Sequence, residues 1–221
     1  MEDKTDITVN KAPQLLNDQI ELYGASTGNS LRAAIALEEA GVAYTARKLD
    51  LYAQEHRGPD YLALNPAGKV PTLIDHGTTP TLVINQSNAI IQYADSIAPG
   101  KLAPAQPGPV RTRVIDRYFF FVTDVIAPSH AAFFLHQAGQ DKAAAIIDLR
   151  VIEQLTYSES FLTGEFMAGE QFSMADISAF TIAMAFRDRL DWKLLPQLSR
   201  WFDTVEAKPA VQRGLNVFKH S

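Results

Sequence analysis

The spacing of hydrophobic and polar positions changes near residue 97 of the chain. Before it, short apolar runs at Ile20 to Tyr23 and at Tyr44 to Leu49 predict two strands. Between them the spacing predicts a helix from about Asn29, with one apolar face and Gly41 as its stop. A strand, a helix and a strand within about thirty residues predict a right-handed βαβ unit.

Two further apolar runs predict a hairpin, because Thr72 to Ile74 and Thr81 to Ile84 flank His76 and a glycine. Ser87 stands where the next helix is expected to begin, and that helix should run to about Ile97. A proline- and glycine-rich linker is expected over residues 98–108.

Everything after the linker favours helices. One should precede Pro128, and others should cover about Asp141 to Phe161, Ser173 to Arg187 and Pro196 to Lys208. The chain is therefore expected to hold an α/β domain over residues 19–97 and an all-helical domain over residues 109–221. Residues 1–18 are polar and acidic, and we expect them to form a short mobile tail.

Composition restricts the possible classes of protein. The chain has 221 residues, of which 47% are hydrophobic, so it can bury a sizeable core and does not resemble a disordered chain. A net charge of -5 argues against nucleic-acid binding, and no apolar run is expected to span a membrane. The absence of cysteine and of a signal pattern points to the cytoplasm. Five histidines without ligand spacing predict no metal.

The most informative motif is the run NPAGKVPTLI at residues 65–74. Pro71 cannot donate a hydrogen bond to a sheet, and it pushes Val70 into an extended conformation. If the bond between them is cis, the N–H and C=O of Val70 stay unpaired by the sheet and can bind a peptide backbone. Ser87 can offer its hydroxyl, its N–H and the positive end of a helix to a carboxylate. The pattern predicts a pocket for a small peptide with a free carboxylate.

Four segments together resemble the glutathione S-transferase family. They are residues 22–31, similar to its first strand and loop, 65–74, similar to its N-P-x-G-x-V-P-x-L segment, 86–90, similar to its (E/Q)-S-x-A-I motif, and 167–176, similar to its x-x-G-x-x-x-(S/T)-x-A-D signature. The resemblance implies a thioredoxin-like N-terminal domain, an all-α C-terminal domain and a glutathione site. It also implies a cytoplasmic detoxification enzyme that is usually a homodimer.

The resemblance also implies which residues of the first loop would activate the thiol. A gap-free alignment on residues 22–23 places Thr27 and Asn29 on the T-x-N pair of the nu class, in which a hydroxyl and an amide activate the thiol. Asn29 also stands where some relatives carry a cysteine. Thr27, Asn29 and Ser30 are therefore expected to act on the glutathione sulfur, with Ser26 as a rival. Gly28 and Ser30 depart from the proline and glycine that are frequent in that class.

Such donors suit the chemistry, because a thiol with a pKa of about 8.5 is mostly protonated at neutral pH and the thiolate is the nucleophile. Donors at a strand-to-helix junction would stabilise the thiolate, and the positive helix end would add to them. Two alternatives stay open. Thr27 and Asn29 could only cap the first helix, and Tyr23 could be either catalytic or a packed aromatic of its strand.

The resemblance also implies which residues bind glutathione. Val70 should pair through its backbone with the cysteinyl part, and Pro71 should shape that loop. Gln86 and Ser87 should hold the γ-glutamyl end, where the alternative for Ser87 is a pure helix cap.

For the glycyl carboxylate, the expected contact is Lys69. Gln54 and His56 are further possible contacts there.

In the helical half, Ser173 and Asp176 have the spacing of a capping box, for which a structural role is expected. The four aromatic residues 118–121 cover all sides of a helix, so some should face a cleft. We expect Tyr118 and Phe121 to line the electrophile pocket. Core packing is expected for most of this group together with the nearby residues 133, 134 and 136.

The predicted function is glutathione transfer, in which the bound thiolate attacks a small apolar electrophile. Three alternatives stay open: glutathione-dependent disulfide reduction, ether cleavage or dehalogenation by the same thiolate, and a non-catalytic binding module of the same fold.

Overall fold

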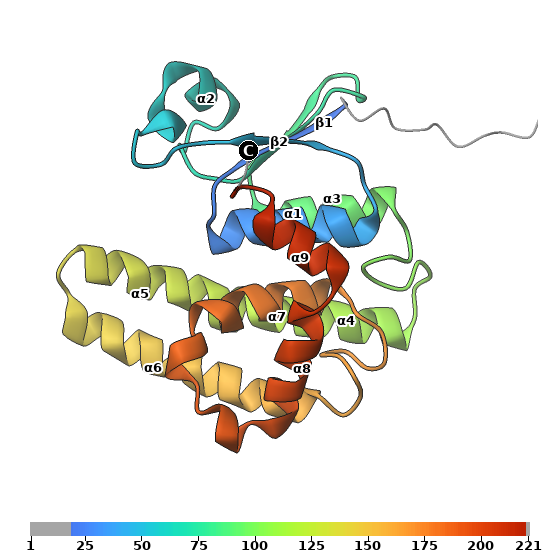
Figure 1. The fold of residues 1–221 in the computed structure, drawn as a ribbon, viewed down its shortest axis with the longest axis vertical. Helices are drawn as coiled ribbons and strands as arrows, with labels where there is room; N and C mark the ends of the chain where they lie inside the picture. Colours follow the sequence, from blue (N-terminus) through green and yellow to red (C-terminus); the bar gives the residue numbers. More distant parts are fainter. Residues whose placement is uncertain (1–18, 220–221) are drawn as a thin grey trace, which may run out of the picture.

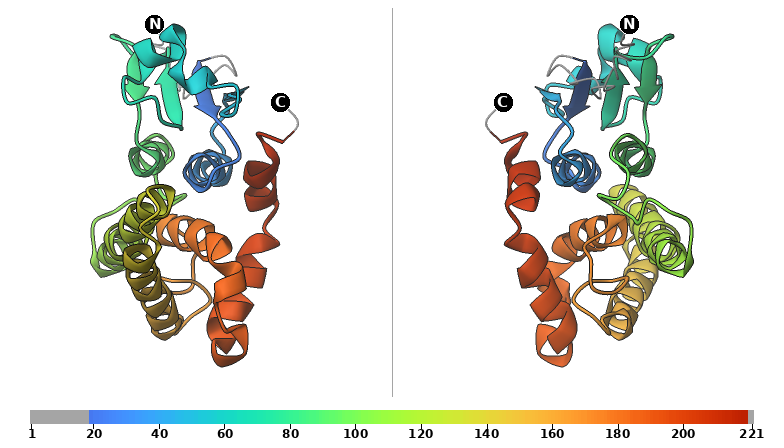
Figure 2. Two further views of the ribbon diagram at one scale, coloured as in Figure 1. Left: turned by 90° about the vertical axis from the view of Figure 1, so that its left-hand side faces the viewer. Right: turned by 90° about the vertical axis from the view of Figure 1, so that its right-hand side faces the viewer.

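The computed structural model describes residues 19–219, so the tail predicted for residues 1–18 lies outside the described residues. An α/β layer lies above a layer of helices, and the two are joined through the pair α1 and α3 (Figure 1). Side views show the sheet, this helix pair and the helical domain as successive layers (Figure 2).

The sheet confirms the predicted strands and hairpin. Its strands are β1 (Ile20–Gly24), β2 (Thr45–Lys48), β3 (Thr72–Asp75) and β4 (Leu82–Ile84), in the order β2-β1-β3-β4. β1 pairs with β2 in parallel, which completes the predicted βαβ unit. β1–β3 and β3–β4 are antiparallel pairs.

Two helices cover one face of the sheet, namely α1 (Gly28–Ala40) and α3 (Ser87–Ile97), whereas the short helix α2 (Pro59–Leu64) lies on the other side (Figure 1). A turn of 3₁₀ helix, η1 (Glu55–Arg57), precedes α2. As predicted, α1 ends at Gly41, whose φ of 68° is the left-handed conformation that glycine adopts readily.

The helical domain contains six α-helices among the described residues. They are α4 (Pro109–Phe120), α5 (Ala127–Gln137), α6 (Asp141–Tyr157), α7 (Met174–Ala185), α8 (Pro196–Glu206) and α9 (Pro209–Asn216). Short 3₁₀ turns are η3 (Ser158–Phe161), η4 (Arg187–Arg189) and η5 (Trp192–Leu194). A π-helical segment, η2 (Phe121–Ile126), joins α4 to α5. The helix expected to end before Pro128 therefore continues past it, and the π-helical segment lies directly before the first turn of α5 that holds the proline.

The continuous helical stretch Pro109–Gln137 qualifies the expectation about membranes. By length and composition alone it is long and apolar enough to cross one, with a mean hydropathy of 1.4. Core helices of water-soluble proteins meet the same criterion. Here α4 packs against α7 and α5 packs against α6, so the stretch is an integral part of the helical domain.

Helix α1 is buried on nearly all sides, and not on one face as the spacing predicts. Residues 30–37 are all buried, because α3, α7 and α9 surround the helix. Gly214 of α9 approaches closely: a Cβ there would lie 2.8 Å from the backbone nitrogen of Ile35. Arg213 of α9 also pairs with Glu38 of α1 at 2.6 Å.

The predicted capping box is present at the start of α7. Ser173 Oγ accepts from the Ala175 N–H at 3.3 Å, and Asp176 Oδ2 accepts from the Ser173 N–H at 2.9 Å. Asp176 Oδ1 also accepts from the Met167 N–H at 2.9 Å and from Trp201 Nε1 at 2.8 Å. Burial raises the pKa of Asp176 to about 6, although these hydrogen bonds act to lower it. One carboxyl group thus ties α7 to the preceding loop and to α8.

We expect Asp176→Ala to lower the free energy of unfolding by about 3 kcal/mol or more, because buried donors lose their acceptor. Ser173→Ala, which removes only the cap, should lower it by about 1 kcal/mol. Urea unfolding followed by circular dichroism measures both values. Equal, small losses in the two variants would contradict the central role of Asp176.

Candidate functional site

The loop before β3 leaves a stretch of backbone available for binding. The bond between Val70 and Pro71 is cis. Within the described part of the chain, Val70 makes no backbone hydrogen bond through its N–H or its C=O. Both groups therefore remain unpaired by the sheet, as the sequence predicts for a cis bond, and their pairing with a ligand stays a prediction.

Polar side chains hold this loop in place. The Lys69 carbonyl accepts from the Tyr61 hydroxyl at 2.7 Å and from Asn65 Nδ2 at 2.6 Å. Thr72 Oγ1 donates to Asn85 Oδ1 at 2.8 Å, and Asn85 Nδ2 donates to the carbonyl that ends α2 at 3.0 Å. Asn85 immediately precedes the Gln86-Ser87 pair, so this network joins the two predicted binding segments. Sequence reasoning missed Asn85, because its partners come from two other elements.

At the start of α3, the two predicted binding residues Gln86 and Ser87 occupy different environments. Gln86 occupies the cap position but makes no side-chain capping bond, and it is exposed. Ser87 is the first residue inside the helix and is only 7% exposed. Its hydroxyl oxygen accepts from Arg32 Nη1 at 3.3 Å. Ser87 is thus not the cap of α3, and its hydroxyl hydrogen is not committed to the helix backbone.

In the first loop, Thr27 and Ser30 bind each other. Thr27 is the cap of α1: its hydroxyl accepts from the Ser30 N–H at 3.3 Å and donates to Ser30 Oγ at 3.1 Å. Ser30 is buried, and its Oγ also accepts from the Ala25 N–H at 3.4 Å. In this structure Thr27 therefore caps α1, which is one of the two roles considered for it from the sequence. The Thr27 hydroxyl thus donates to Ser30, whereas the Ser30 oxygen accepts in both of its bonds.

Asn29 is held differently, because its Oδ1 accepts from Arg32 Nη1 at 2.9 Å. The same guanidinium nitrogen binds Ser87, and Arg32 Nε donates to Thr181 Oγ1 on α7 at 3.0 Å. Burial lowers the pKa of Arg32 to about 10, which leaves the side chain charged at neutral pH. Sequence reasoning missed Arg32, although an arginine within a run of alanine and leucine was a visible signal.

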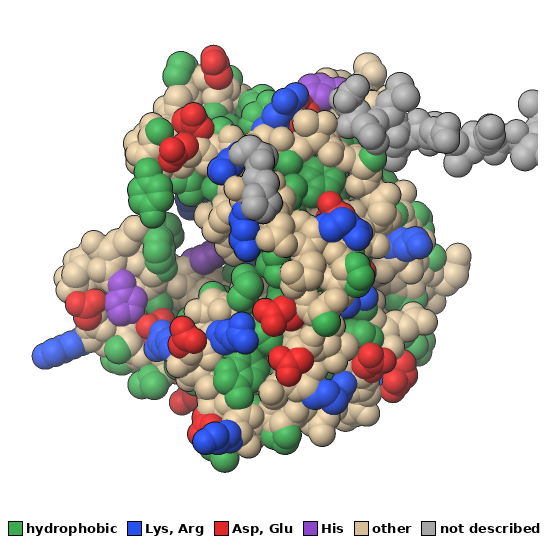
Figure 3. All heavy atoms as spheres, viewed as in Figure 1, with side chains coloured by type: hydrophobic (Ala, Val, Ile, Leu, Met, Phe, Trp, Pro, Cys, Tyr) green, Lys and Arg blue, Asp and Glu red, His purple; other side chains and the backbone are tan. Residues whose placement is uncertain are grey.

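A hollow opens between the α/β layer and α5, with basic and histidine side chains in it (Figure 3). Lys69 Nζ lies 5.6 Å from the ring centre of Phe134 on α5. Packing around the ring of His130 lowers its pKa, and the charges of Arg32 and Lys69 add to this effect, although His130 is exposed overall. Phe133 and Phe134 are each 54% exposed, so these two aromatic residues do not take the core position expected for most of their group.

The two residues predicted for the electrophile pocket lie inside the protein. Tyr118 is 1% exposed and its hydroxyl donates to the Asn88 carbonyl at 2.8 Å, and Phe121 is fully buried. Their role stays a prediction. Gln54 is exposed in a turn, where its Nε2 donates to the Leu51 carbonyl at 3.2 Å. Its contact with a ligand also stays a prediction.

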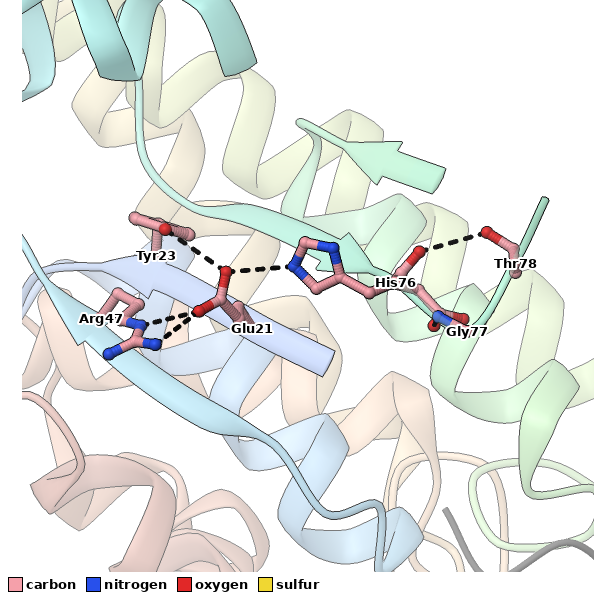
Figure 4. A network of polar contacts seen from close by, with 7 residues as sticks. Glu21, Tyr23, Arg47, His76, Gly77 and Thr78 are labelled. Atoms are coloured by element: carbon pink, nitrogen blue, oxygen red, sulfur yellow. Dashed lines mark hydrogen bonds and ion pairs between the residues drawn. The ribbon is translucent and has the colours of Figure 1, made fainter. Parts of the chain in front are cut away.

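Tyr23 lies on the outer face of the sheet. Its hydroxyl donates to Glu21 Oε2 at 3.4 Å, and Glu21 also binds Arg47 at 2.7 Å and His76 at 3.2 Å (Figure 4). Burial raises the pKa of Tyr23, and the charge of Glu21 raises it further. The ring packs against Tyr61 of α2, with 6.1 Å between ring centres. Tyr23 is therefore a packed aromatic with an engaged hydroxyl.

A separate cavity of about 720 Å³ lies between the linker, the start of α4 and the loop before α7. Its lining residues include Lys101, Arg113 and Phe172, and none of the predicted site residues. No cluster of three metal-ligating side chains occurs within residues 19–219.

Comparison with known families covers both layers of the fold. Residues 28–97 match the family model described as "Glutathione S-transferase, N-terminal domain". Residues 123–215 match the one described as "Glutathione S-transferase, C-terminal domain".

Individual relatives match over nearly their whole length. Glutathione S-transferase 4 of Zea mays is 30% identical, over 88% of this chain and 91% of that protein. Disulfide-bond oxidoreductase YfcG of Escherichia coli is 27% identical, over 89% and 94%. A crystal structure of a Burkholderia graminis glutathione transferase, with two glutathione molecules bound per subunit, is 26% identical with a TM-score of 0.81, over 92% and 90%.

The network around Asn85 gives a prediction about stability. Asn85→Ala removes an acceptor from Thr72 and a donor from the end of α2, so it should lower the free energy of unfolding by about 1–3 kcal/mol. The double variant with Thr72→Val should cost less than the sum of the two single changes, since the two residues share a bond. A cycle of the two single variants and the double variant in urea measures the coupling, and strict additivity would contradict it.

Proposed function

The chain belongs to the glutathione S-transferase family, and we propose on that premise that it transfers glutathione to a small apolar electrophile. Glutathione would lie between the loop before β3, the start of α3 and the start of α1. Its thiolate sulfur would form a bond to carbon, and the leaving group would depart with its electron pair.

The observation that carries the proposal is that Asn29 and Ser87 are hydrogen-bonded to the same arginine. Both side chains accept hydrogen bonds from Arg32 Nη1, at 2.9 and 3.3 Å, although they lie on different helices. A residue predicted to meet the sulfur and one predicted to meet the γ-glutamyl end therefore lie within reach of one guanidinium nitrogen. An extended tripeptide has the length to meet both and also the free backbone of Val70.

The contacts proposed for glutathione follow the geometry. The N–H and C=O of Val70 pair with its cysteinyl backbone, and Pro71 shapes the loop. The hydroxyl of Ser87 and the exposed amide of Gln86 bind the γ-glutamyl end, helped by the positive end of α3. Lys69, beside the hollow, binds the glycyl carboxylate.

Stabilising the thiolate requires modest free energy, because lowering the thiol pKa by one or two units takes about 1.4–2.8 kcal/mol. Asn29 is the favoured donor to the sulfur, since its amide hydrogens are free while its oxygen is held. Thr27 would have to exchange its bond to Ser30 for one to the sulfur. We retain the T-x-N assignment of the nu class on these grounds.

The second substrate would lie against the exposed aromatic side chains of α5. Phe134 adjoins Lys69, so an electrophile bound there would be close to the glycyl end of the site. We further propose that the protein is a cytoplasmic homodimer.

A second candidate function is disulfide reduction. It is favoured by the relative named a disulfide-bond oxidoreductase and by the neighbour that holds two glutathione molecules per subunit. This chain has no cysteine, so both electrons would come from two glutathione molecules. The thiolate of one glutathione would attack the disulfide and release its first sulfur as a thiolate, which takes up a proton. The thiolate of the second glutathione would attack the glutathione sulfur of the mixed disulfide, release the other sulfur in the same way and give oxidised glutathione.

The roles at the sulfur are tested by the ultraviolet absorbance of the bound thiolate during a pH titration. We expect Asn29→Ala to raise the bound thiol pKa by about one unit, as the loss of about 1.4 kcal/mol of thiolate stabilisation requires. Thr27→Ala should raise it less. An unchanged thiol pKa in both variants would refute these roles.

Binding is tested by calorimetry with reduced glutathione. Ser87→Ala should weaken the affinity about tenfold, since a hydrogen bond to a carboxylate contributes about 1.5 kcal/mol or more. The thiol pKa should change little. Turnover of a panel of electrophiles and of a small disulfide then separates the two enzymatic candidates, and binding without any turnover would favour a non-catalytic module.

A further inference from the structure

Arg32 is a buried cation that has no acidic partner among the described residues. Its residue surface is 2% exposed, and among residues 19–219 it forms no ion pair. A buried charge is costly unless hydrogen bonds or an opposite charge stabilise it. Here the only stabilising groups within hydrogen-bond distance are neutral side chains.

Three of the five guanidinium hydrogens of Arg32 each have one acceptor among the described residues. Nε carries one hydrogen and donates to Thr181 Oγ1 at 3.0 Å. Nη1 carries two hydrogens and has two acceptors, Asn29 Oδ1 at 2.9 Å and Ser87 Oγ at 3.3 Å. The guanidinium therefore joins α1, α3 and α7 at one point between the two domains.

These bonds fix the orientation of both neighbouring groups, because a guanidinium donates only. The Asn29 amide has to turn its oxygen toward Arg32, so its Nδ2 hydrogens point away from it. The Ser87 oxygen accepts from Arg32, so its hydroxyl hydrogen stays available to another acceptor. Each residue is thereby presented to the site as a donor.

We propose that Arg32 is a positioning residue that sets both glutathione donors at once, the Asn29 amide toward the thiolate sulfur and the Ser87 hydroxyl toward the γ-glutamyl carboxylate. This inference rests on the proposed function. It adds to it the group that couples recognition of the γ-glutamyl end to activation of the thiol.

The charge of Arg32 strengthens both donors. A hydrogen bond from a cation draws electron density from the amide oxygen, which makes the Nδ2 hydrogens better donors to an anion. The titratable groups that interact with Arg32 are Tyr118, whose pKa burial raises, and His130, whose pKa is lowered by packing around its ring and by the charges of Arg32 and Lys69, so both are neutral near pH 7. The field at the site therefore stays positive.

The decisive variant is Arg32→Met. Methionine fills much of the space of the arginine stem but lacks the guanidinium group, so it removes both the hydrogen-bond donors and the charge. We expect the pKa of the bound glutathione thiol to rise by about one unit or more, and the acid limb of the kcat/KM profile to move up by the same amount. The wild type separates two failures. If it does not bind reduced glutathione, the proposed function fails, whereas if it binds and Arg32→Met keeps the wild-type thiol pKa, only this inference fails.

Two matched variants distinguish positioning from packing. Thr181→Val removes the acceptor of Nε but keeps the charge and both bonds of Nη1, so the thiol pKa should stay at the wild-type value. Arg32→Lys keeps the charge but cannot bind both acceptors in the same geometry, so it should restore the thiol pKa only in part. A shift in Thr181→Val as large as that in Arg32→Met would overturn the inference.

The wild type also decides the question if Arg32→Met fails to fold. The side-chain amide signals of Asn29 in a nuclear magnetic resonance spectrum are identified by their loss in Asn29→Ala. They should shift when reduced glutathione is added, and the shift should titrate with the bound thiol. Signals that do not respond to glutathione would overturn the proposed orientation of Asn29.

Discussion

The burial of α1 on every side is the constraint on which the arrangement of this protein depends. The helix lies between the sheet and the helical domain, and α3, α7 and α9 leave almost none of residues 30–37 exposed. Any polar side chain in that stretch must find its partners within the protein. Arg32 finds them on three helices, so the packing of the two domains and the geometry of the site are set by the same contacts.

The two binding segments are made into one unit by a second set of contacts. The loop before β3 and the start of α3 are held together through Asn85, whose amide has one partner on β3 and one at the end of α2. The free backbone of Val70 is thereby kept at a fixed place relative to the Ser87 hydroxyl. A rigid site of this kind loses little conformational entropy when it binds a flexible tripeptide.

Local sequence signals were sufficient for much of the fold. The strands, the hairpin, the Gly41 stop and the capping box at Ser173 all depend on residues close together in the chain. The exposure of Phe134, the continuity of the helix across Pro128 and the burial of α1 on all sides depend on segments that meet only in the folded protein. Sequence motifs likewise indicated Asn29 and Ser87 one at a time. Their connection through Arg32 could not be predicted, because α1 and α3 meet only in the folded protein.

The packing of α9 has a consequence for how the protein is made on the ribosome. Gly214 lies against the backbone of Ile35, and the buried ring of Phe218 lies against Gly24 at the end of β1. These partners are synthesised long after the sheet and α1 have left the exit tunnel. One side of α1 and the first loop must therefore remain exposed to solvent until α9 emerges. A nascent chain that has completed only the α/β layer thus exposes an apolar surface, the kind of surface to which chaperones bind.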